Sequence, residues 1–421
     1  MIETLRNAWK IPELRKKLMF TALVLLLYRI GNVIPVPYVN VDALKATFDA
    51  VLGDTILGLY NAMSGSAFSQ ATVLALSIQP YINASIIIQL LTVAIPALER
   101  MAKEEGEEGK KKLTMITRFA TVGLGLIMGW AFYSMLNSYG IITKPGFLPG
   151  LVIVLAFTAG SAVVMWLGEQ INEYGIGNGI SMILFANIIS GLPSGLSKMI
   201  DMSWWAILVA IVMLALVLFI IFVNDAERRI PIQYAKRVVG RKIYGGQSTN
   251  LPIKVSMSGV MPVIFAQSIC SFPATICAFF GVTAQSGKWW YDVFFSNTSW
   301  FYAFIYFIMI FFFGWFYAAI QYDPVEIANN LKKNGGFIPG FRPGKPTADF
   351  IAKVISKIVI FGSLYLGVVA LLPIICGNLI PGAGSLAIGG TSVIIVIGVA
   401  LETVKAIEAQ MLMRHYKGFL D

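Results

Sequence analysis

WWAILVAIVMLALVLFIIFVN, residues 204–224, is a run of 21 positions without a charged side chain. An α-helix rises about 1.5 Å per residue, so a run of this length crosses the roughly 30 Å hydrocarbon core of a bilayer. Aspartates stand on either side of the run, at Asp201 and Asp225. The stretch therefore predicts a transmembrane helix.

The chain contains nine further apolar runs of similar length. Of its 421 residues, 57% are hydrophobic and 13% are charged, about half the charged fraction of a soluble domain. We expect an all-α polytopic membrane protein with ten transmembrane helices. The other nine runs are 18–36, 72–94, 116–136, 148–168, 179–196, 258–280, 299–320, 354–376 and 388–410.

The basic residues gather in alternate connections between these runs. Of the 32 Lys and Arg residues, 25 lie in 1–17, 95–118, 225–257, 321–353 or after 410. Cytoplasmic loops are enriched in Lys and Arg, so both termini are expected in the cytoplasm. The connection near 169–178 is an exception, because it has no basic residue although the count places it inside.

Ten helices divide into two sets of five, and an odd number in each set inverts the second half relative to the first. We expect halves at 18–196 and 197–410, with long cytoplasmic loops at 225–257 and 321–353 in the second. They would lie between a cytoplasmic segment, 1–17, and a cytoplasmic tail, 411–421. No small-residue cleavage site follows the first run, so we expect it to be retained as a helix.

Catalytic and metal-binding signatures are missing from the sequence. His415 is the single histidine, and Cys270 and Cys277 lie about 10 Å apart along one helix. We find no phosphate-binding loop, no H-E-x-x-H and no G-x-S-x-G motif. We therefore expect no catalytic residue, metal or cofactor, and a partner would have to supply energy for any uphill transport.

Residues 56–70, ILGLYNAMSGSAFSQ, are too short to span the membrane and rich in small side chains. Two interpretations remain open: a short half-helix that enters a cavity, and an external amphipathic loop. Arg29, inside the first run, also has two interpretations, because its charge either extends to the external interface or has a functional role. Glu402 and Lys405 are three residues apart on one helix and are expected to pair.

Two long basic loops carry most of the polar information. Residues 234–255, YAKRVVGRKIYGGQSTNLPIKV, alternate basic and apolar positions and predict a hairpin turning at Gly245 and Gly246. Residues 329–344, NNLKKNGGFIPGFRPG, present Arg342 on a loop between glycines and prolines. Loops of about 30 residues exceed what orientation in the membrane needs and are often functional.

Several motifs, in this order, carry a family resemblance. They are YRIG (28–31), IPVP (34–37), PYINASIIIQLLT (80–92), MWLGEQINEYGIGNGIS (165–181), AERRIPIQYAKR (226–237), QSTNLPIKV (247–255), MPVIFAQSICSFPATI (261–276), NNLKKNGGFIPGFRPG (329–344) and GGTSVIIV (389–396). On these motifs the chain resembles the SecY family of bacterial protein-translocation channels.

The resemblance implies an hourglass pore between two pseudo-symmetric halves, closed by an apolar ring and a short re-entrant plug helix within 58–70. An apolar ring offers water and ions no hydrogen bonds and gates by dewetting. The implied ring residues are Ile82, Ile86, Ile180, Leu184, Ile264 and Ile395. The implied plug residues are Leu59, Ala62, Ser64, Gly65, Ser66 and Phe68.

The resemblance also implies a lateral gate, through which hydrophobic segments enter membrane lipid. Gln89 and Gln267 lie on gate helices and are hypothesised to hydrogen-bond when the gate is shut. The two loops would dock a ribosome or the SecA motor ATPase. The docking residues would be Lys236, Arg237, Arg241, Lys242, Lys332, Lys333 and Arg342.

The implied setting is the bacterial cytoplasmic (inner) membrane. The implied partners are small membrane subunits resembling SecE and SecG, with signal sequences and nascent polypeptides as the cargo. A secondary transporter also has inverted repeats, but it needs polar or acidic groups at mid-depth, where this chain has apolar residues. An intramembrane enzyme would need a Ser/His pair or paired aspartates, which the sequence does not offer.

Overall fold

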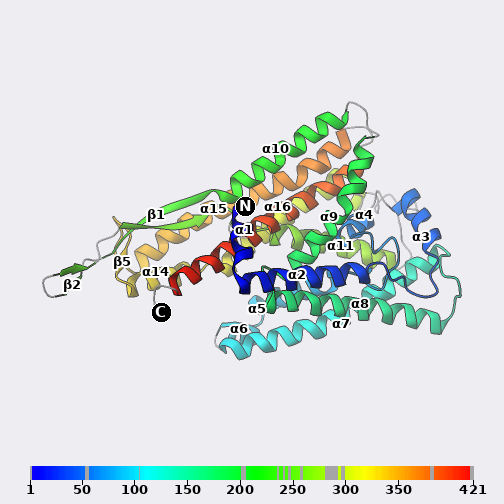
Figure 1. Cartoon of the computed structure of the whole chain (residues 1–421), viewed down its shortest axis with the longest axis horizontal. Coiled ribbons are helices and arrows are strands. Elements are labelled where there is room, and N and C mark those ends of the chain that lie inside the picture. Colours follow the sequence, from blue (N-terminus) through cyan, green and yellow to red (C-terminus); the bar gives the residue numbers. More distant parts are fainter. Residues whose placement is uncertain are drawn as a thin grey trace.

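Long helices lying side by side make up most of the molecule in the computed structural model (Figure 1). The structure describes residues 2–52, 56–103, 105–200, 205–234, 237–239, 242–244, 248–256, 259–279, 293–294, 299–379 and 384–417. Every expected apolar run overlaps a helix. These helices are α2 (Pro12–Gly31), α5 (Gln79–Ala94), α7 (Gly106–Ser138), α8 (Phe147–Tyr174), α9 (Gly179–Ile200), α10 (Trp205–Asp225), α11 (Met261–Phe279), α13 (Trp300–Gln321), α15 (Lys345–Leu379) and α16 (Gly384–Lys417).

Shorter elements connect them. They are α1 (Ile2–Lys10), α3 (Val41–Thr47), the π-helix Phe48–Leu52, α4 (Ile56–Met63), α6 (Pro96–Lys103) and α14 (Pro324–Lys333). By length and hydropathy alone, four helical stretches among the described residues qualify as membrane spans. The pair α5 and α6, bent by 107°, would make a fifth. The helical membrane fold is confirmed, and the number of ten spans stays a prediction.

Two of the expected helix boundaries are wrong, and for a common reason. Helix α2 ends at Gly31 and α5 begins only at Gln79. The end of the first run and the start of the second instead pair with each other, since Val73 N donates to Ile34 O at 2.9 Å and Val36 N donates to Ala71 O at 3.0 Å. These pairs satisfy backbone hydrogen-bonding groups that a helix would otherwise have to satisfy.

The all-α expectation is incomplete, because a β-hairpin extends beyond the helices (Figure 1). Its strands β1 (Glu227–Tyr234) and β4 (Ser248–Lys254) are antiparallel, and β5 (Gly336–Phe337) pairs with the other edge of β1. Farther out, β2 (Arg237–Val239) pairs with β3 (Lys242–Tyr244). Val239 is opposite Lys242 in this pair, and the turn predicted at Gly245 and Gly246 lies outside the described residues.

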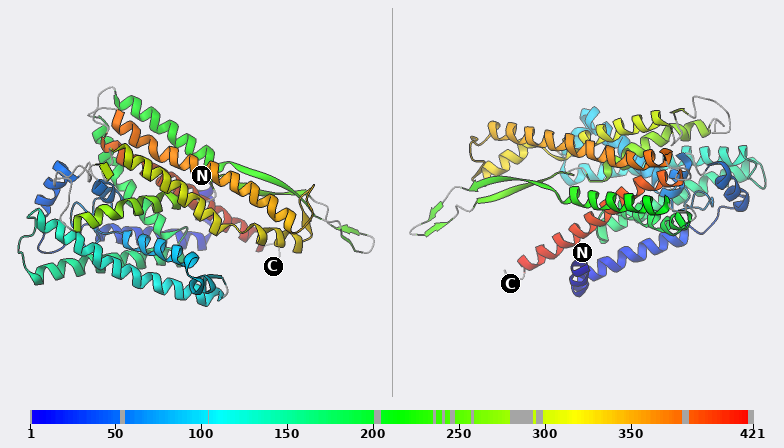
Figure 2. Two further views of the ribbon diagram at one scale, coloured as in Figure 1. Left: turned by 180° about the vertical axis from the view of Figure 1, so that it is seen from behind. Right: turned by 90° about the horizontal axis from the view of Figure 1, so that it is seen from above.

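A small hydrophobic core ties the base of the hairpin to the second loop. Ile230 and Ile232 of β1 are each 3% exposed and pack with α14 and α15 residues, among them Leu331 and Ile351. The two long loops predicted from the sequence therefore form one structural unit. In both views of Figure 2 this unit lies at one end of the molecule, and α3 lies at the opposite end.

The outward faces of the long helices are strongly apolar. Large exposed side chains on them include Leu26, Phe119, Leu218, Phe222 and Phe304. Contiguous apolar surface of this extent is unusual in water-soluble proteins. It is the surface that lipid chains would cover.

Candidate functional site

The six predicted ring residues all belong to, or pack against, one large hydrophobic cluster that draws on most of the long helices. Five of them are at most 2% exposed, and Ile180 is partly buried against the same cluster. They come from four helices that are distant in the sequence. Ile82 and Ile86 are on α5, Ile180 and Leu184 on α9, Ile264 on α11 and Ile395 on α16.

Helix α4 lies inside the molecule and reaches this cluster. Its last residue, Met63, is 3% exposed and belongs to the cluster. Helix α4 contacts both α9 and α16. Of the two interpretations of residues 56–70, hereafter the α4 segment, the structure has the short inner helix and not the external loop.

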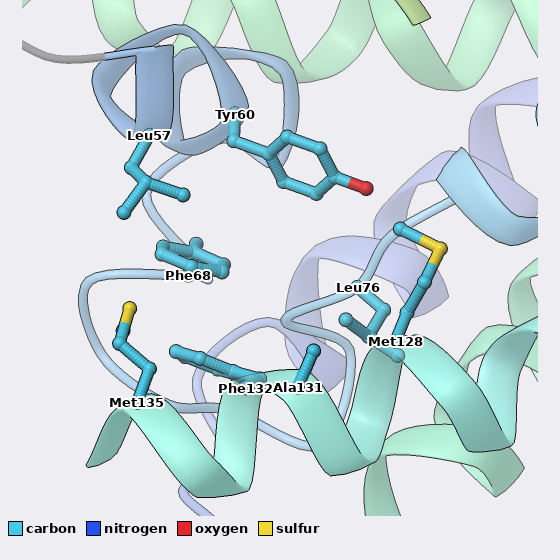
Figure 3. A pocket seen from close by; sticks show the side chains of 8 residues that line it. All are labelled: Leu57, Tyr60, Phe68, Leu76, Met128, Ala131, Phe132 and Met135. Carbon is cyan, nitrogen blue, oxygen red and sulfur yellow. The ribbon is translucent and has the colours of Figure 1, made fainter. Parts of the chain in front are cut away.

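Aromatic residues hold one side of the α4 segment against α7. The rings of Phe68 and Phe132 are stacked, with centroids 4.1 Å apart and planes 15° from parallel. Beside them is a small cavity of about 20 Å³ (Figure 3). Apart from the Tyr60 hydroxyl, its lining is apolar: Leu57, Tyr60, Phe68, Leu76, Met128, Ala131, Phe132 and Met135.

A buried amide on α9 contacts the end of α4. Asn187 is 0% exposed, and its Nδ2 donates to the Met63 carbonyl oxygen at 2.8 Å. The same nitrogen lies 2.8 Å from the Tyr28 hydroxyl and 3.3 Å from Ser77 Oγ. Tyr28 and Ser77 also hydrogen-bond each other at 3.1 Å. This network joins α2, α4, α9 and the residues before α5.

The turn after α4 is pressed against α2 and α9. Gly65 has φ +65°, and a Cβ there would lie 2.7 Å from Arg29 Nη1 and 2.8 Å from Asn187 Oδ1. Only glycine suits such a backbone at so close an approach. Arg29 Nη1 is buried with no hydrogen-bond partner, and Asn32 Nδ2 donates to Ser64 O at 3.3 Å. Arg29 therefore faces the α4 segment with this atom.

The hypothesised pair on the gate helices is not formed. The structure shows no hydrogen bond between Gln89 and Gln267 among the described residues, and Gln267 Oε1 is buried without a partner. The polar contact between α5 and α11 is instead made by Ser268 Oγ, 3.4 Å from Gln79 Oε1. Gln89 lies about 15 Å along α5 from Gln79, too far to take its place.

Five of the seven predicted docking residues are described by the structure, and they lie on the hairpin and on the second loop. Lys332 and Lys333 are exposed at the end of α14, and Arg342 is exposed on the loop before α15. The Arg342 carbonyl accepts a 2.8 Å hydrogen bond from Thr347 Oγ1, which holds the loop backbone. Arg237 and Lys242 lie on β2 and β3, whereas Lys236 and Arg241 lie outside the described residues.

The remaining predicted residues, those of the plug, lie within the α4 segment. Leu59 and Ala62 lie on α4, while Ser64 and Gly65 lie in the turn that follows, with Ser66 just beyond. Ser64 is 1% exposed and its Oγ accepts from Phe68 N at 3.1 Å. The structure does not describe the side chain of Leu59.

The expected pair of Glu402 and Lys405 is wrong. Lys405 Nζ lies 2.8 Å from Asp225 Oδ1 and donates to Asn224 O at 3.3 Å. The end of α10 lies beside α16, so Lys405 reaches across to another helix and not along its own. Glu402 Oε1 instead faces the turn at Gly259.

Four polar residues of this region were not among the predicted site residues: Tyr28, Ser77, Gln79 and Asn187. Asn187 had a usable signal, since it is a lone amide within the apolar run 179–196, where polar groups are costly and therefore often functional. Tyr28 and Ser77 had none, because each is unremarkable within its own apolar run. Among the described residues there is no cluster of three or more His, Cys, Asp or Glu side chains suited to a metal ion.

Comparison with known proteins shows similarity along the whole chain. The family model SecY matches residues 72–404. "Protein translocase subunit SecY" of Streptomyces scabiei is 43% identical over 440 residues, covering 100% of both chains. The protein of the same name from Halalkalibacterium halodurans is 42% identical over 435 residues, again covering 100% of both.

Solved structures share the fold at lower identity. The structure of a protein conducting channel has a TM-score of 0.67 at 19% identity and covers 97% of each chain. Sec61 in the canine ribosome-channel complex has a TM-score of 0.63 at 17% identity, with the same coverage.

Proposed function

Because the chain belongs to the SecY family, we propose that it is a protein-conducting channel whose pore is closed by the six-residue apolar ring and by the α4 segment as its plug. Unfolded secretory polypeptides pass along the pore. Hydrophobic segments leave sideways between α5 and α7 on one side and α11 and α13 on the other. The channel is passive, and a partner hydrolyses the nucleotide that drives export.

The observation that carries this proposal is the apolar cluster itself. Within it the six ring residues come from α5 and α9 of the first half and from α11 and α16 of the second, and Met63 at the end of α4 belongs to the same cluster. An apolar ring of branched side chains excludes ions by dewetting and still yields around a polypeptide of any sequence. A transporter would instead need polar or charged side chains at this place to bind its solute.

The partners follow from the exposed basic unit and from the relatives. Sec61 in the solved complex is bound to a ribosome, and the basic hairpin and Arg342 loop offer this chain a surface for ribosomal RNA phosphates. The same surface serves the SecA motor, and SecE-like and SecG-like subunits clamp the helices from outside. The setting is the bacterial inner membrane, with both termini cytoplasmic.

Crosslinking of a stalled secretory chain tests the channel directly. The native cysteines, Cys270, Cys277 and Cys376, are first replaced by serine. Single cysteines are then placed by Ile82→Cys or Ile264→Cys in the ring, with Ile207→Cys as the control because Ile207 is 66% exposed on α10. We expect crosslinks at 82 and 264 and none at 207. Absence of crosslinks at both ring positions, with saturable uptake of a small solute, would favour a transporter.

A further inference from the structure

We propose that the channel wall holds the plug shut by capping the C-terminal end of α4, and that Asn187 is the main positioning residue of this polar latch. The latch consists of Asn187 on α9 with Arg29 and Asn32 on and after α2. The inference rests on the proposed function, since it assigns residues that set how readily the pore opens.

The C-terminal end of α4 is hydrogen-bonded to the channel wall. The last four carbonyl groups of any α-helix have no partner within the helix. In α4 the following turn supplies three donors, since Ser64 N, Ser66 N and Gly65 N bond the carbonyls of residues 60, 61 and 62. The wall supplies the fourth, because Asn187 Nδ2 donates to Met63 O at 2.8 Å, and Asn32 Nδ2 donates to Ser64 O, just beyond the helix, at 3.3 Å. A helix of eight residues with its end capped by other helices is fixed to the wall at that end.

Arg29 places a positively charged group beside the turn after α4. The C-terminal end of a helix carries a partial negative charge and attracts cations. Arg29 Nη1 lies against Gly65, two residues beyond the end of α4, and has no hydrogen-bond partner of its own. In the ion pairs found among the described residues, no carboxylate neutralises Arg29. Its charge is therefore available to the helix end.

The turn at Gly65 is packed closely against α2 and α9. The space beside Gly65 is filled by Arg29, Asn187 and Ser190, the last with its Oγ 3.1 Å from the position of a Cβ. The turn can dock only without a side chain. Removal of the plug would leave Asn187, which is 0% exposed, without its partner on Met63. A single neutral hydrogen bond contributes little net stability, so the latch is strong enough to bias the plug and weak enough to be released.

The test uses the purified channel complex in proteoliposomes and measures two quantities. One is ion leak in the absence of cargo. The other is the rate at which an impermeant maleimide, added outside, labels Ala62→Cys on α4 in a background without native cysteines. Asn187→Leu keeps the side-chain size and removes the donor, whereas Asn137→Leu makes the same change at an exposed position of α7.

We expect Asn187→Leu and Asn32→Ala each to raise both quantities by about two- to tenfold, the loss of one hydrogen bond. Gly65→Ala should act in the same direction, and Asn137→Leu should leave both unchanged. If Asn187→Leu fails to fold, Asn32→Ala decides the question from a different helix. Unchanged leak and labelling in Asn187→Leu and Asn32→Ala would overturn the latch.

Failure of the latch is distinguishable from failure of the proposed function. Translocation of a secretory protein by the unaltered complex is measured in the same vesicles. If the unaltered complex translocates and the variants neither leak nor label faster, the latch alone is wrong. If the unaltered complex translocates nothing, the channel function is wrong, and the latch as a gate falls with it.

Discussion

Phe68 of the α4 segment stacks on Phe132 of α7, with ring centroids 4.1 Å apart. Phe132 in turn contacts Phe157 of α8, with centroids 4.9 Å apart. The proposed plug is thus held by aromatic packing on α7 as well as by hydrogen bonds to α9. Contacts of these two kinds respond differently to mutation.

Phe132→Ala tests the aromatic contact. Stacked pairs contribute about 0.5–1.5 kcal/mol beyond the burial of their area, so loss of this ring should loosen the plug. We expect the resting ion leak of vesicles to rise about two- to tenfold. Phe119→Ala is the matched control, because Phe119 is on the same helix and 73% exposed. An equal leak in both variants would show that Phe68 needs no partner on α7.

Ile86→Asn tests the apolar ring. A buried amide gives water a hydrogen-bonding partner at the constriction, so the closed pore should wet and conduct ions. We expect a clear single-channel conductance in planar bilayers without cargo. Ile87→Asn serves for comparison, since Ile87 is the next residue on α5 but is 41% exposed. A silent Ile86→Asn channel would argue that the plug alone makes the seal.

The Arg118 and Glu169 pair joins α7 to α8, with Arg118 Nη2 2.9 Å from Glu169 Oε2. The arginine side chain is 52% exposed, so the pair should contribute no more than about 1 kcal/mol. Arg118→Glu or Glu169→Arg alone should lower the melting temperature of the purified protein, and the double swap should restore most of it. A double swap as unstable as the sum of its parts would show that the charges do not interact.

Arg342→Glu tests the docking surface. The backbone of its loop is held by Thr347 and not by the arginine side chain, so the fold should persist. We expect motor-driven export of a secretory protein to fall at least about tenfold through charge repulsion at the interface. Lys45→Glu, an equal charge change at an exposed position of α3, should have no effect. Export at the normal rate in Arg342→Glu would remove this residue from the docking surface.

Much of this architecture is encoded locally. Long apolar runs predict helices because an isolated backbone must satisfy its own hydrogen bonds in lipid. The same rule failed at residues 33–36 and 72–78, where two hydrogen bonds join the neighbouring apolar stretches and local turns satisfy other backbone groups, so that no helix is needed. Such pairing depends on which segments come together in the fold, and hydropathy along the sequence does not predict which ones do.

The candidate site, like the fold, could be predicted from the sequence only in part. The ring residues could be named from the family resemblance, and the structure brings them together. Asn187 could have been noticed as a lone amide in its apolar run, but Tyr28 and Ser77 could not be named, because each is unremarkable within its own segment and gains its role only from its partners. The expected Glu402 and Lys405 pair failed likewise, since helix spacing makes the two neighbours but Asp225 lies closer to the lysine.

The hairpin is joined to the helices in a way that bears on mechanical coupling. Gln233 of β1 pairs with Phe337 of β5, and the chain from β5 leads into α15, a single helix of 35 residues. Such a helix is about 50 Å long, enough to run from the loop end of the molecule through the bundle. A force on the hairpin would therefore be transmitted to α15. From α15 it would pass to helices α13 and α16, which pack against it. Force applied outside the membrane has a stiff path to the pore.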